Sequence, residues 1–581
     1  MKPNKIALAL LLAPSLLAQQ KVPTPDTIFL HGNILTGTNL LTPSPNRVSA
    51  IAVAKGTILA VGTDAQIEAL KTPTTKVIDL NNAFAMPGFN DAHTHIASAG
   101  QQKLTVDLDH VPSLADMQAR IRSFTAALPA GAWVQGGGWD HTLWASKTLP
   151  TRQDLDAVTA GHPAILSRTD GHIAIVNSAA LVAAGISSAT PDPAGGKIDR
   201  DASGTPTGII RETSALTLIR SKIPPLSLEQ RRKALNYAIA DVLAHGVTSV
   251  QDNSDWEDFL ALEELEYTHH LHLRVSEWLA FATPLPTLKE RRASHPANDP
   301  LLHLGMLKGF MDGSLGSRTA ALDAPYSDEP ANSGIPRYTQ EALNQLATER
   351  AAAGFQLGFH AIGDHANAMA LNAFAAAEQV APHAETPRTT LRYRIEHAQV
   401  LLPADFARFQ SEGIIASMQP SHLLTDMNWA PARLGPERVK FSYAWKSLLD
   451  HHVTLAFGTD YPVESIDPFR GLYSAITRQN EAGTMTFEPQ EKITLNQALY
   501  AYTQASAFAE FEEKTKGILA PGYFADLIVL DRDITKATPL ELLHTQVLET
   551  IVNGDVVYAR QSNTIADNTI HPTYIDDDAD E

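Results

Sequence analysis

The stretch Pro87-Gly-Phe-Asn-Asp-Ala-His-Thr-His95 closes an apolar, extended segment with two histidines, His93 and His95. Side chains at positions i and i+2 of a strand point to the same face, so both imidazoles can reach one ion. An isolated His-x-His pair is weak evidence for a metal site. The stretch therefore predicts a strand that ends in a candidate site, and the remaining ligands have to come from elsewhere in the chain.

Three later segments each place a candidate ligand at the end of an expected strand. Their last residues are His360 after Gly358-Phe, His397 after Arg394-Ile-Glu, and Asp460 after the apolar run that starts at Val453. In a barrel the C-terminal strand ends share one face, which is the active-site face. Asp460 alone can also be a helix N-cap before Tyr461-Pro462. Glu396 is predicted to point to the strand face opposite His397 and to be structural.

The pattern of apolar residues changes twice along the chain. Short alternating segments with turn signals, among them Lys55-Gly56 and Asn553-Gly554, predict β-hairpins over 24–87 and again over 513–562. Over 88–512, apolar runs alternate with helical stretches such as 228–245, 340–354 and 367–380, which predicts βα units around a parallel sheet. We expect the two hairpin regions to pair into one small β domain.

Composition excludes several classes of protein. The 581 residues have a formal net charge of −19, which would repel a polyanion, so no nucleic-acid partner is expected. Five acids in the last six residues indicate a solvated acidic tail over 563–581. Without cysteine there is no disulfide, thiolate zinc site, iron-sulfur cluster or cysteine nucleophile. Any metal must be held by histidine, carboxylate or modified lysine.

The N-terminus has the pattern of an export signal. Lys2 and Lys5 precede an apolar run from Ile6 to Leu17, and Ala18 offers a small residue for cleavage. The alternative is a hydrophobic first strand or helix. A signal peptide over 1–18 predicts an exported protein, periplasmic or secreted. No other stretch reaches the ~18 apolar residues that a membrane helix needs, so no membrane span is expected after signal removal.

The sequence resembles the amidohydrolase superfamily, and most closely amidohydrolase family 3, the group that includes N-substituted formamide deformylases. The resemblance covers nearly the whole chain after residue 18. It rests on motifs in the expected order: Pro87-Gly-Phe-Asn-Asp-Ala-His-Thr-His, Asp312-Gly-Ser-Leu-Gly-Ser-Arg-Thr-Ala-Ala-Leu, His360-Ala-Ile-Gly-Asp, Arg394-Ile-Glu-His, Gly458-Thr-Asp-Tyr-Pro-Val-Glu and Gly517-Ile-Leu-Ala-Pro-Gly-Tyr-Phe-Ala-Asp-Leu.

The resemblance implies an α/β fold, a (β/α)₈ TIM-like barrel with a small β-sandwich formed by both chain ends. It also implies one or two divalent metal ions inside the barrel, zinc first, with manganese, iron or cobalt as alternatives. The ligands carried over, from the first, fourth, fifth, sixth and eighth strands, are His93 and His95, Lys308, His360, His397 and Asp460.

Lys308 is expected to be carboxylated by CO₂, as in many relatives, and to bridge the metals. It stands in an apolar run, where a bare ammonium would be costly to bury. The alternative is a lysine that extends to the barrel mouth or pairs with Asp312.

Two further residues are candidates for substrate binding. His172, in Asp170-Gly-His172, matches the substrate-side motif that the family has on its second or third strand. Arg318 lies in a glycine-rich loop after the Lys308 strand and can bind a substrate carboxylate through two parallel hydrogen bonds. The alternatives are that His172 has only a structural role and that Arg318 braces its loop through a salt bridge.

These features favour a metal-dependent hydrolase that cleaves a non-peptide carbon-nitrogen bond, an amide or N-acyl group, in a small-molecule substrate. Asp460 is the expected catalytic residue, since it can accept a proton from the attacking water and deliver it to the departing nitrogen. Two alternatives stay open: an exported binding or regulatory protein with a non-catalytic site, and a glycosidase with two carboxylates on the same barrel. A homodimer is also left open.

Overall fold

The computed structural model describes residues 24–169, 172–193, 195–380 and 391–561. The expected signal peptide over 1–18 and the acidic tail over 563–581 lie outside these ranges. Among the described residues, no helix has both the length and the apolar character needed to cross a membrane.

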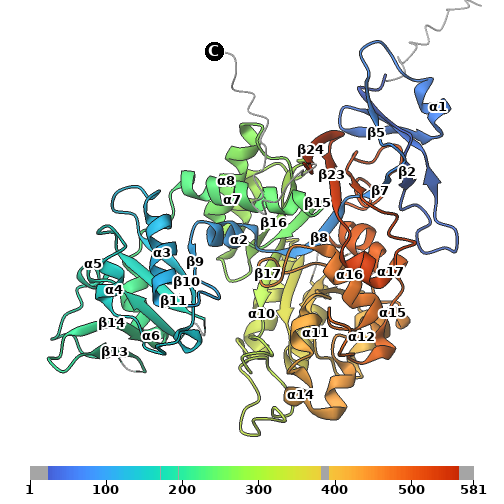
Figure 1. Ribbon diagram of the computed structural model, residues 1–581. Coiled ribbons are helices and arrows are strands. Elements are labelled where there is room, and N and C mark those ends of the chain that lie inside the picture. Colours follow the sequence, from blue (N-terminus) through green and yellow to red (C-terminus); the bar gives the residue numbers. More distant parts are fainter. Residues whose placement is uncertain (1–23, 170–171, 194, 381–390, 562–581) are drawn as a thin grey trace, which may run out of the picture.

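Both chain ends contribute to a pair of β-sheets at one side of the molecule, blue and red in Figure 1. The smaller sheet has the order β5-β4-β1-β6, with strands β1 (Thr27–Leu30), β4 (Ala50–Ala54), β5 (Thr57–Gly62) and β6 (Lys76–Asp79). The larger has the order β24-β23-β22-β7-β2-β3, with strands β2 (Asn33–Leu35), β3 (Arg47–Val48), β7 (Phe84–Pro87), β22 (Leu527–Leu530), β23 (Val547–Val552) and β24 (Asp555–Ala559).

A shared apolar cluster joins the two sheets. Phe29 and Ile51 from the smaller sheet pack with Ala85, Leu527 and Ile551 from the larger. Strand β22 runs antiparallel to β7, so C-terminal strands complete a sheet that the N-terminal segment begins. The positive φ angles of 55° and 82° at Asn553 and Gly554 form the tight turn between β23 and β24 that this dipeptide predicts.

The centre of the molecule is a parallel eight-stranded barrel, which confirms the predicted fold class. The sheet order is β21-β20-β19-β18-β17-β16-β15-β8. Its strands are β8 (Phe89–Thr94), β15 (Val247–Asp252), β16 (Arg274–Ala280), β17 (Leu302–Phe310), β18 (Leu357–Ala361), β19 (Arg394–His397), β20 (Ile415–Met418) and β21 (Leu455–Phe457). The barrel closes where Asp460 N donates to His93 O at 2.8 Å and His95 N donates to Tyr461 O at 2.8 Å.

Helices pack around the barrel, as the sequence pattern predicts. Three of them match the expected stretches closely: α7 (Leu228–Ala244), α10 (Gln340–Ala352) and α11 (Asp364–Glu378). The first begins with a capping box between Ser227 and Gln230, which satisfies two backbone N–H groups at that end. Its buried residues Leu235 and Val242 join the core cluster that lies between the helices and the strands.

A further unit is inserted between α2 (Ile96–Lys103) and α7, and it lies apart from the barrel in Figure 1. Its sheet has the order β13-β14-β12-β11-β10-β9. The elements are β9 (Val106–Asp107), α3 (Leu114–Thr125), β10 (Val134–Trp139), α4 (Arg152–Asp156), β11 (Ala164–Arg168), β12 (Ile173–Val176), α5 (Ser178–Ala183), β13 (Lys197–Arg200), β14 (Pro206–Arg211) and α6 (Glu212–Arg220).

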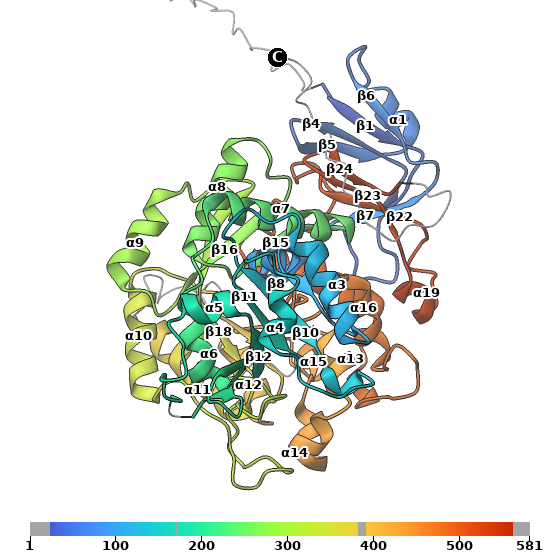
Figure 2. The same ribbon diagram turned by 60° about the vertical axis from the view of Figure 1, so that its left-hand side comes forward.

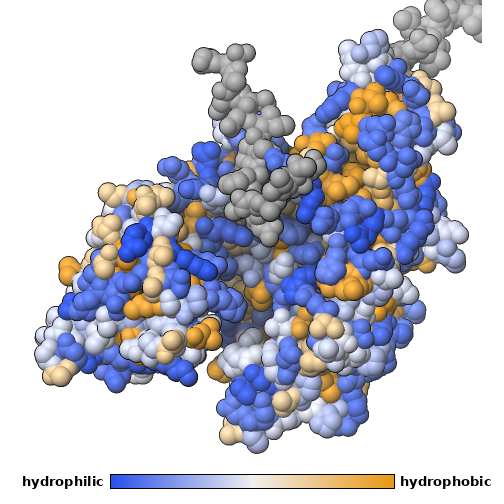
Figure 3. All heavy atoms as spheres, in the orientation of Figure 1, coloured by the Kyte–Doolittle hydropathy of each residue, from blue (hydrophilic) through white to orange (hydrophobic). Residues whose placement is uncertain are grey.

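This inserted unit has its own apolar cores, one around Trp139 and Leu166 and one around Ile198 and Ile210. In Figure 2 it comes forward over the barrel, and Figure 3 shows a hollow between the two. The sequence interpretation treated 88–512 as barrel alone and did not separate this unit. Helices are interspersed among its strands, as in the barrel, although β12 follows β11 and β14 follows β13 without a helix between them. The local sequence pattern does not say which sheet a strand joins.

Candidate metal centre

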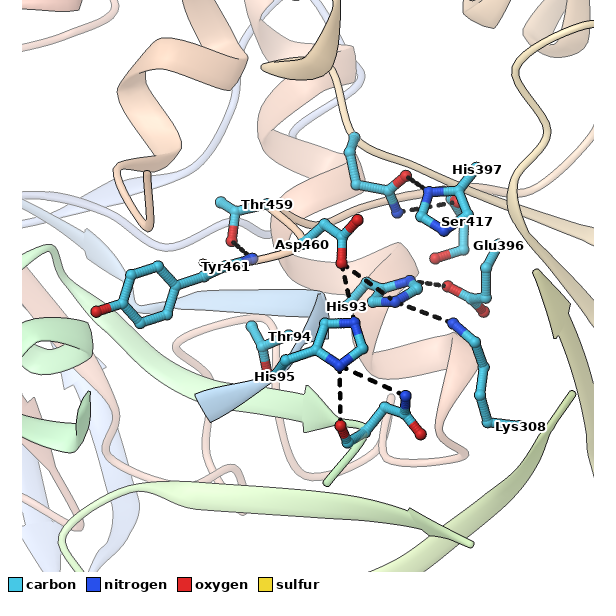
Figure 4. A network of polar contacts seen from close by, with 12 residues as sticks. His93, Thr94, His95, Lys308, Glu396, His397, Ser417, Thr459, Asp460 and Tyr461 are labelled. Atoms are coloured by element: carbon cyan, nitrogen blue, oxygen red, sulfur yellow. Dashed lines mark hydrogen bonds and ion pairs between the residues drawn. The ribbon is translucent and has the colours of Figure 1, made fainter. Parts of the chain in front are cut away.

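The C-terminal ends of the barrel strands bring the predicted ligands together (Figure 4). Donor atoms of His93, His397 and Asp460 all lie within 4.8 Å of one another. The Nζ atom of Lys308 is 3.0 Å from Nε2 of His93. Nε2 of His95 is 3.0 Å from Oδ1 of Asp460. Five of the six predicted ligands, from four different strands, therefore meet in one space.

Three of the histidines are held in the same way. Nδ1 of each ring contacts an oxygen acceptor that is not one of the predicted ligands. The acceptors are Glu396 Oε2 at 2.7 Å from His93, the Asn253 carbonyl at 2.9 Å from His95, and Gln419 Oε1 at 2.7 Å from His397. Such contacts place the proton on Nδ1 and leave the Nε2 lone pair directed inward. Metal-binding histidines are oriented by outer acceptors of this kind.

His360, the sixth predicted ligand, lies beside this group with the opposite ring orientation. Its ring centroid is 4.5 Å from that of His397, and its Nε2 contacts the Gly313 carbonyl at 3.0 Å. A carbonyl can only accept, so Nε2 carries the proton and Nδ1 is the nitrogen left with a lone pair.

Glu396 faces the barrel interior together with His397, so the prediction that it points to the opposite face was wrong. The physical reason is the backbone: His397 and Ala398 have φ angles of 76° and 44°, which break the strand alternation. Arg394 donates to Oε1 of Glu396 at 2.5 Å. Burial alone would raise the pKa of Glu396, but the charge of Arg394 and the hydrogen bond with His93 lower it to about 2.

Lys308 is buried against His93 and not paired with Asp312. Its Nζ lies 5.1 Å from the ring centres of Trp278 and Phe310. The Asp312 carboxylate instead accepts the backbone N–H groups of Ala321, Ile362 and Gly363 at 2.9, 3.1 and 2.8 Å. Burial lowers the pKa of Lys308 to about 8, which makes the neutral amine accessible near neutral pH.

Asp460 has a left-handed backbone, with φ of 61°, three residues after the end of the eighth barrel strand. Its Oδ1 is 3.0 Å from Nε2 of His95 and 3.6 Å from Nε2 of His93. Burial alone would raise the pKa of Asp460, but the facing His93 and His95 hold it well below its ordinary value. The carboxylate is therefore ionised.

His422 is a site residue that the sequence interpretation missed. It begins α13 (His422–Asp426), just after barrel strand β20, and only 7 % of it is exposed. Its Nε2 lies 3.5 Å from Oδ2 of Asp460, on the side of the carboxylate away from the His95 contact. The signal was the apolar run Ile415–Met418 followed at once by Gln419-Pro-Ser-His422.

The two predicted substrate-binding residues each contact a carboxylate that is not among the predicted ligands. His172 is not on the second or third barrel strand: it precedes β12 of the inserted sheet, where Nδ1 is 3.1 Å from Oε2 of Glu212. Arg318 donates to both carboxylate oxygens of Asp328 at 3.1 and 2.8 Å, and its Nε is 3.4 Å from Glu329. These contacts are those of the alternative, a salt bridge that braces the loop. A substrate role for either residue stays a prediction.

The residues present fit a divalent metal. Several imidazole nitrogens with their lone pairs inward and one ionised carboxylate form a donor set of the kind that zinc and related cations bind. Among the described residues, Oδ1 of Asp460 is also a buried oxygen without a hydrogen-bond partner of good geometry. A cation would satisfy that oxygen.

Comparison with known proteins gives consistent matches. Residues 76–558 match the sequence model of the amidohydrolase family. The protein LONG AFTER FAR-RED 3 of Arabidopsis thaliana is 33 % identical over 92 % of this chain and 91 % of its own. The N-substituted formamide deformylase of Arthrobacter pascens is 28 % identical over 92 % and 98 %. A metal-dependent hydrolase from Pyrococcus furiosus superposes with a TM-score of 0.73 at 29 % identity, over 88 % of this chain and 99 % of that one.

Proposed function

The chain belongs to the amidohydrolase family, as the sequence predicts, and we propose that it is a metal-dependent hydrolase that cleaves the carbon-nitrogen bond of small N-acyl amides. One observation supports the proposal above all others. Each of four histidines has one ring nitrogen held by a protein acceptor, while the other nitrogen is left for a ligand. The similarity to a formamide deformylase supports the amide as the bond class.

In this proposal His93, His95, His360, His397 and Asp460 hold one or two divalent cations, zinc first. Lys308, if carboxylated by CO₂, would supply oxygen ligands to them. The pKa of about 8 at Lys308 favours this modification, because only the neutral amine can attack CO₂. A divalent metal there would polarise the substrate carbonyl and lower the pKa of a water molecule toward ~7.

The residues of the chain then move the proton. Asp460 accepts it as a water oxygen bonds to the carbonyl carbon, and delivers it to the nitrogen as the carbon-nitrogen bond breaks. The products are a carboxylic acid and an amine. Glu396 does not take part as an acid, because its pKa of about 2 keeps it ionised between Arg394 and His93. Glu396 is therefore not the proton donor that the glycosidase alternative needs.

The proposal includes export, which rests on the sequence pattern of residues 1–18. The alternative of a binding or regulatory protein is less favoured, because every predicted ligand position is filled by a metal-binding residue type.

The test uses the purified protein with zinc and a panel of N-alkyl formamides, N-acetyl amines and aryl glycosides. We expect amine release from amides, loss of turnover after a chelator, and recovery when zinc is added. Turnover that persists in metal-free protein, or that occurs only on glycosides, would contradict the proposal.

A further inference from the structure

His422 is buried beside the predicted ligands and has a defined tautomer. Its ring lies 5.9 Å from that of His397, and the two planes are 14° apart. The side-chain amide nitrogen of Gln399 is 3.2 Å from Nδ1 of His422. An amide nitrogen can only donate, so Nδ1 accepts and the proton of the neutral ring is on Nε2.

That Nε2–H group has no acceptor of good geometry among the described residues. Oδ2 of Asp460 lies 3.5 Å away, beyond the usual 2.7–3.2 Å of a strong N–H···O bond. A buried donor without a partner is unfavourable for the folded state. The donor is therefore available to an acceptor atom that enters beside the Asp460 carboxylate.

We propose that His422 is a catalytic residue that donates a hydrogen bond from Nε2 to the carbonyl oxygen of the substrate. The bond strengthens as that oxygen becomes negatively charged when water adds to the carbon, and the proton stays on His422 throughout. This inference rests on the proposed function and deepens it. Because Nε2 is a donor only, the substrate must present an acceptor oxygen there, which selects acyl amides over substrates that carry an amino group on an aromatic ring.

The placement supports this role. Oδ1 of Asp460 faces His93 and His95, whereas Oδ2 faces His422. A carbonyl oxygen beside His422 therefore brings the attached nitrogen close to the carboxylate that has to protonate it. A donor fixed before the reaction stabilises developing charge without reorganisation, and removing one such donor typically costs ~10² to 10³-fold in kcat.

The experiment compares His422→Leu, which removes the donor, with His422→Gln, which keeps an N–H near the position of Nε2. The substrates are N-butylformamide and N-butylthioformamide, whose sulfur is a weak acceptor. On the amide we expect His422→Leu to lose ~10² to 10³-fold in kcat, with little change in KM, and His422→Gln to recover at least tenfold. On the thioamide the loss should be under tenfold, and zinc per chain should stay unchanged in both variants.

Equal losses on both substrates, no recovery with glutamine, or loss of zinc would overturn the proposal. If His422→Leu does not fold, Gln399→Leu provides the second test. It leaves the ring of His422 in place but no longer fixes which ring nitrogen carries the proton. We expect kcat to fall roughly tenfold on the amide and to stay unchanged on the thioamide. An unchanged rate would contradict the role.

The same assay distinguishes a failure of the proposed function from a failure of the role proposed for His422. If the wild-type protein binds zinc but cleaves no amide, the proposed function fails. Calorimetric binding of formate to the zinc-loaded protein then tests His422 directly. Affinity at least tenfold weaker in His422→Leu supports the donor role, and equal affinity overturns it.

Discussion

Oε2 of Glu396 lies 2.7 Å from Nδ1 of His93 inside the barrel, and Arg394 binds the same carboxylate. The carboxylate fixes both the orientation of the imidazole and the nitrogen that carries its proton. Glu396→Gln should therefore weaken metal binding by ~10 to 100-fold, the usual cost of losing such an outer partner. Zinc titration of the apoprotein measures this.

A matched control is Glu412→Gln, which removes the partner of Arg408 on a helix outside the barrel. It should leave zinc affinity unchanged. If Glu396→Gln also binds zinc as the wild type does, the contact is structural only.

Lys308 lies 3.0 Å from Nε2 of His93 and is the expected bridge between two cations. Lys308→Ala should then lose metal and turnover, and short carboxylic acids such as propionate should restore part of both by supplying the missing oxygens. Metal analysis and rates with and without the acid measure this. An unmodified lysine in an active, metal-loaded crystal would instead indicate a mononuclear enzyme.

Asp460→Asn separates proton transfer from metal binding. The amide keeps the size and one ligating oxygen but loses the basicity, and general acid-base catalysis is typically worth ~10² to 10⁴-fold. We expect kcat to fall by about that factor while most of the zinc is retained. Full activity would exclude Asp460 as the proton carrier, and complete loss of zinc would make it primarily a ligand.

Stability should depend on pH through Glu266 and Asp299, away from the metal centre. Burial, with the hydrogen bond and charge of Asp299, raises the pKa of Glu266 from 4.5 to about 7. The folded state then binds more protons than the unfolded state between pH 4.5 and 7, so the free energy of unfolding falls as the pH rises through this range. The contribution of this pair to stability is therefore smallest above pH 7. Glu266→Gln should raise Tm at pH 8 by on the order of 1 °C and leave it unchanged at pH 4.5 and below.

Glu257→Gln, at an exposed position in the first turn of the same helix, is the control and should not raise Tm at pH 8, because a carboxylate in the first turn is favoured by the helix dipole. The same pattern in both variants would argue against a shared proton between Glu266 and Asp299.

The sequence could predict those parts of the site that local pattern specifies. His93 and His95 are two residues apart at a strand end, so the strand period alone places both rings on one face. The position of Glu396 was missed because the left-handed backbone at His397 interrupts that period. His422 was missed because it begins a helix after its strand and not at the strand end itself.

The inserted sheet could not be separated from the barrel for a related reason. Ala164–Arg168 begins with an apolar run like that of a barrel strand, and only its long-range pairing assigns it to another sheet. His172 was expected on a barrel strand because Asp170-Gly-His172 matches a motif that the family has there. The hairpin at Asn553-Gly554, whose turn is encoded by two adjacent residues, was predicted correctly.

The most direct test of the metal centre is the metal content of the purified protein. Elemental analysis after expression in zinc-supplemented medium should find one or two divalent ions per wild-type chain. His93→Ala, which removes a buried ring in contact with Lys308, Glu396 and Asp460, should be folded, nearly free of metal and inactive. A wild-type protein without metal, or a His93→Ala variant that keeps both its metal and its activity, would contradict the account.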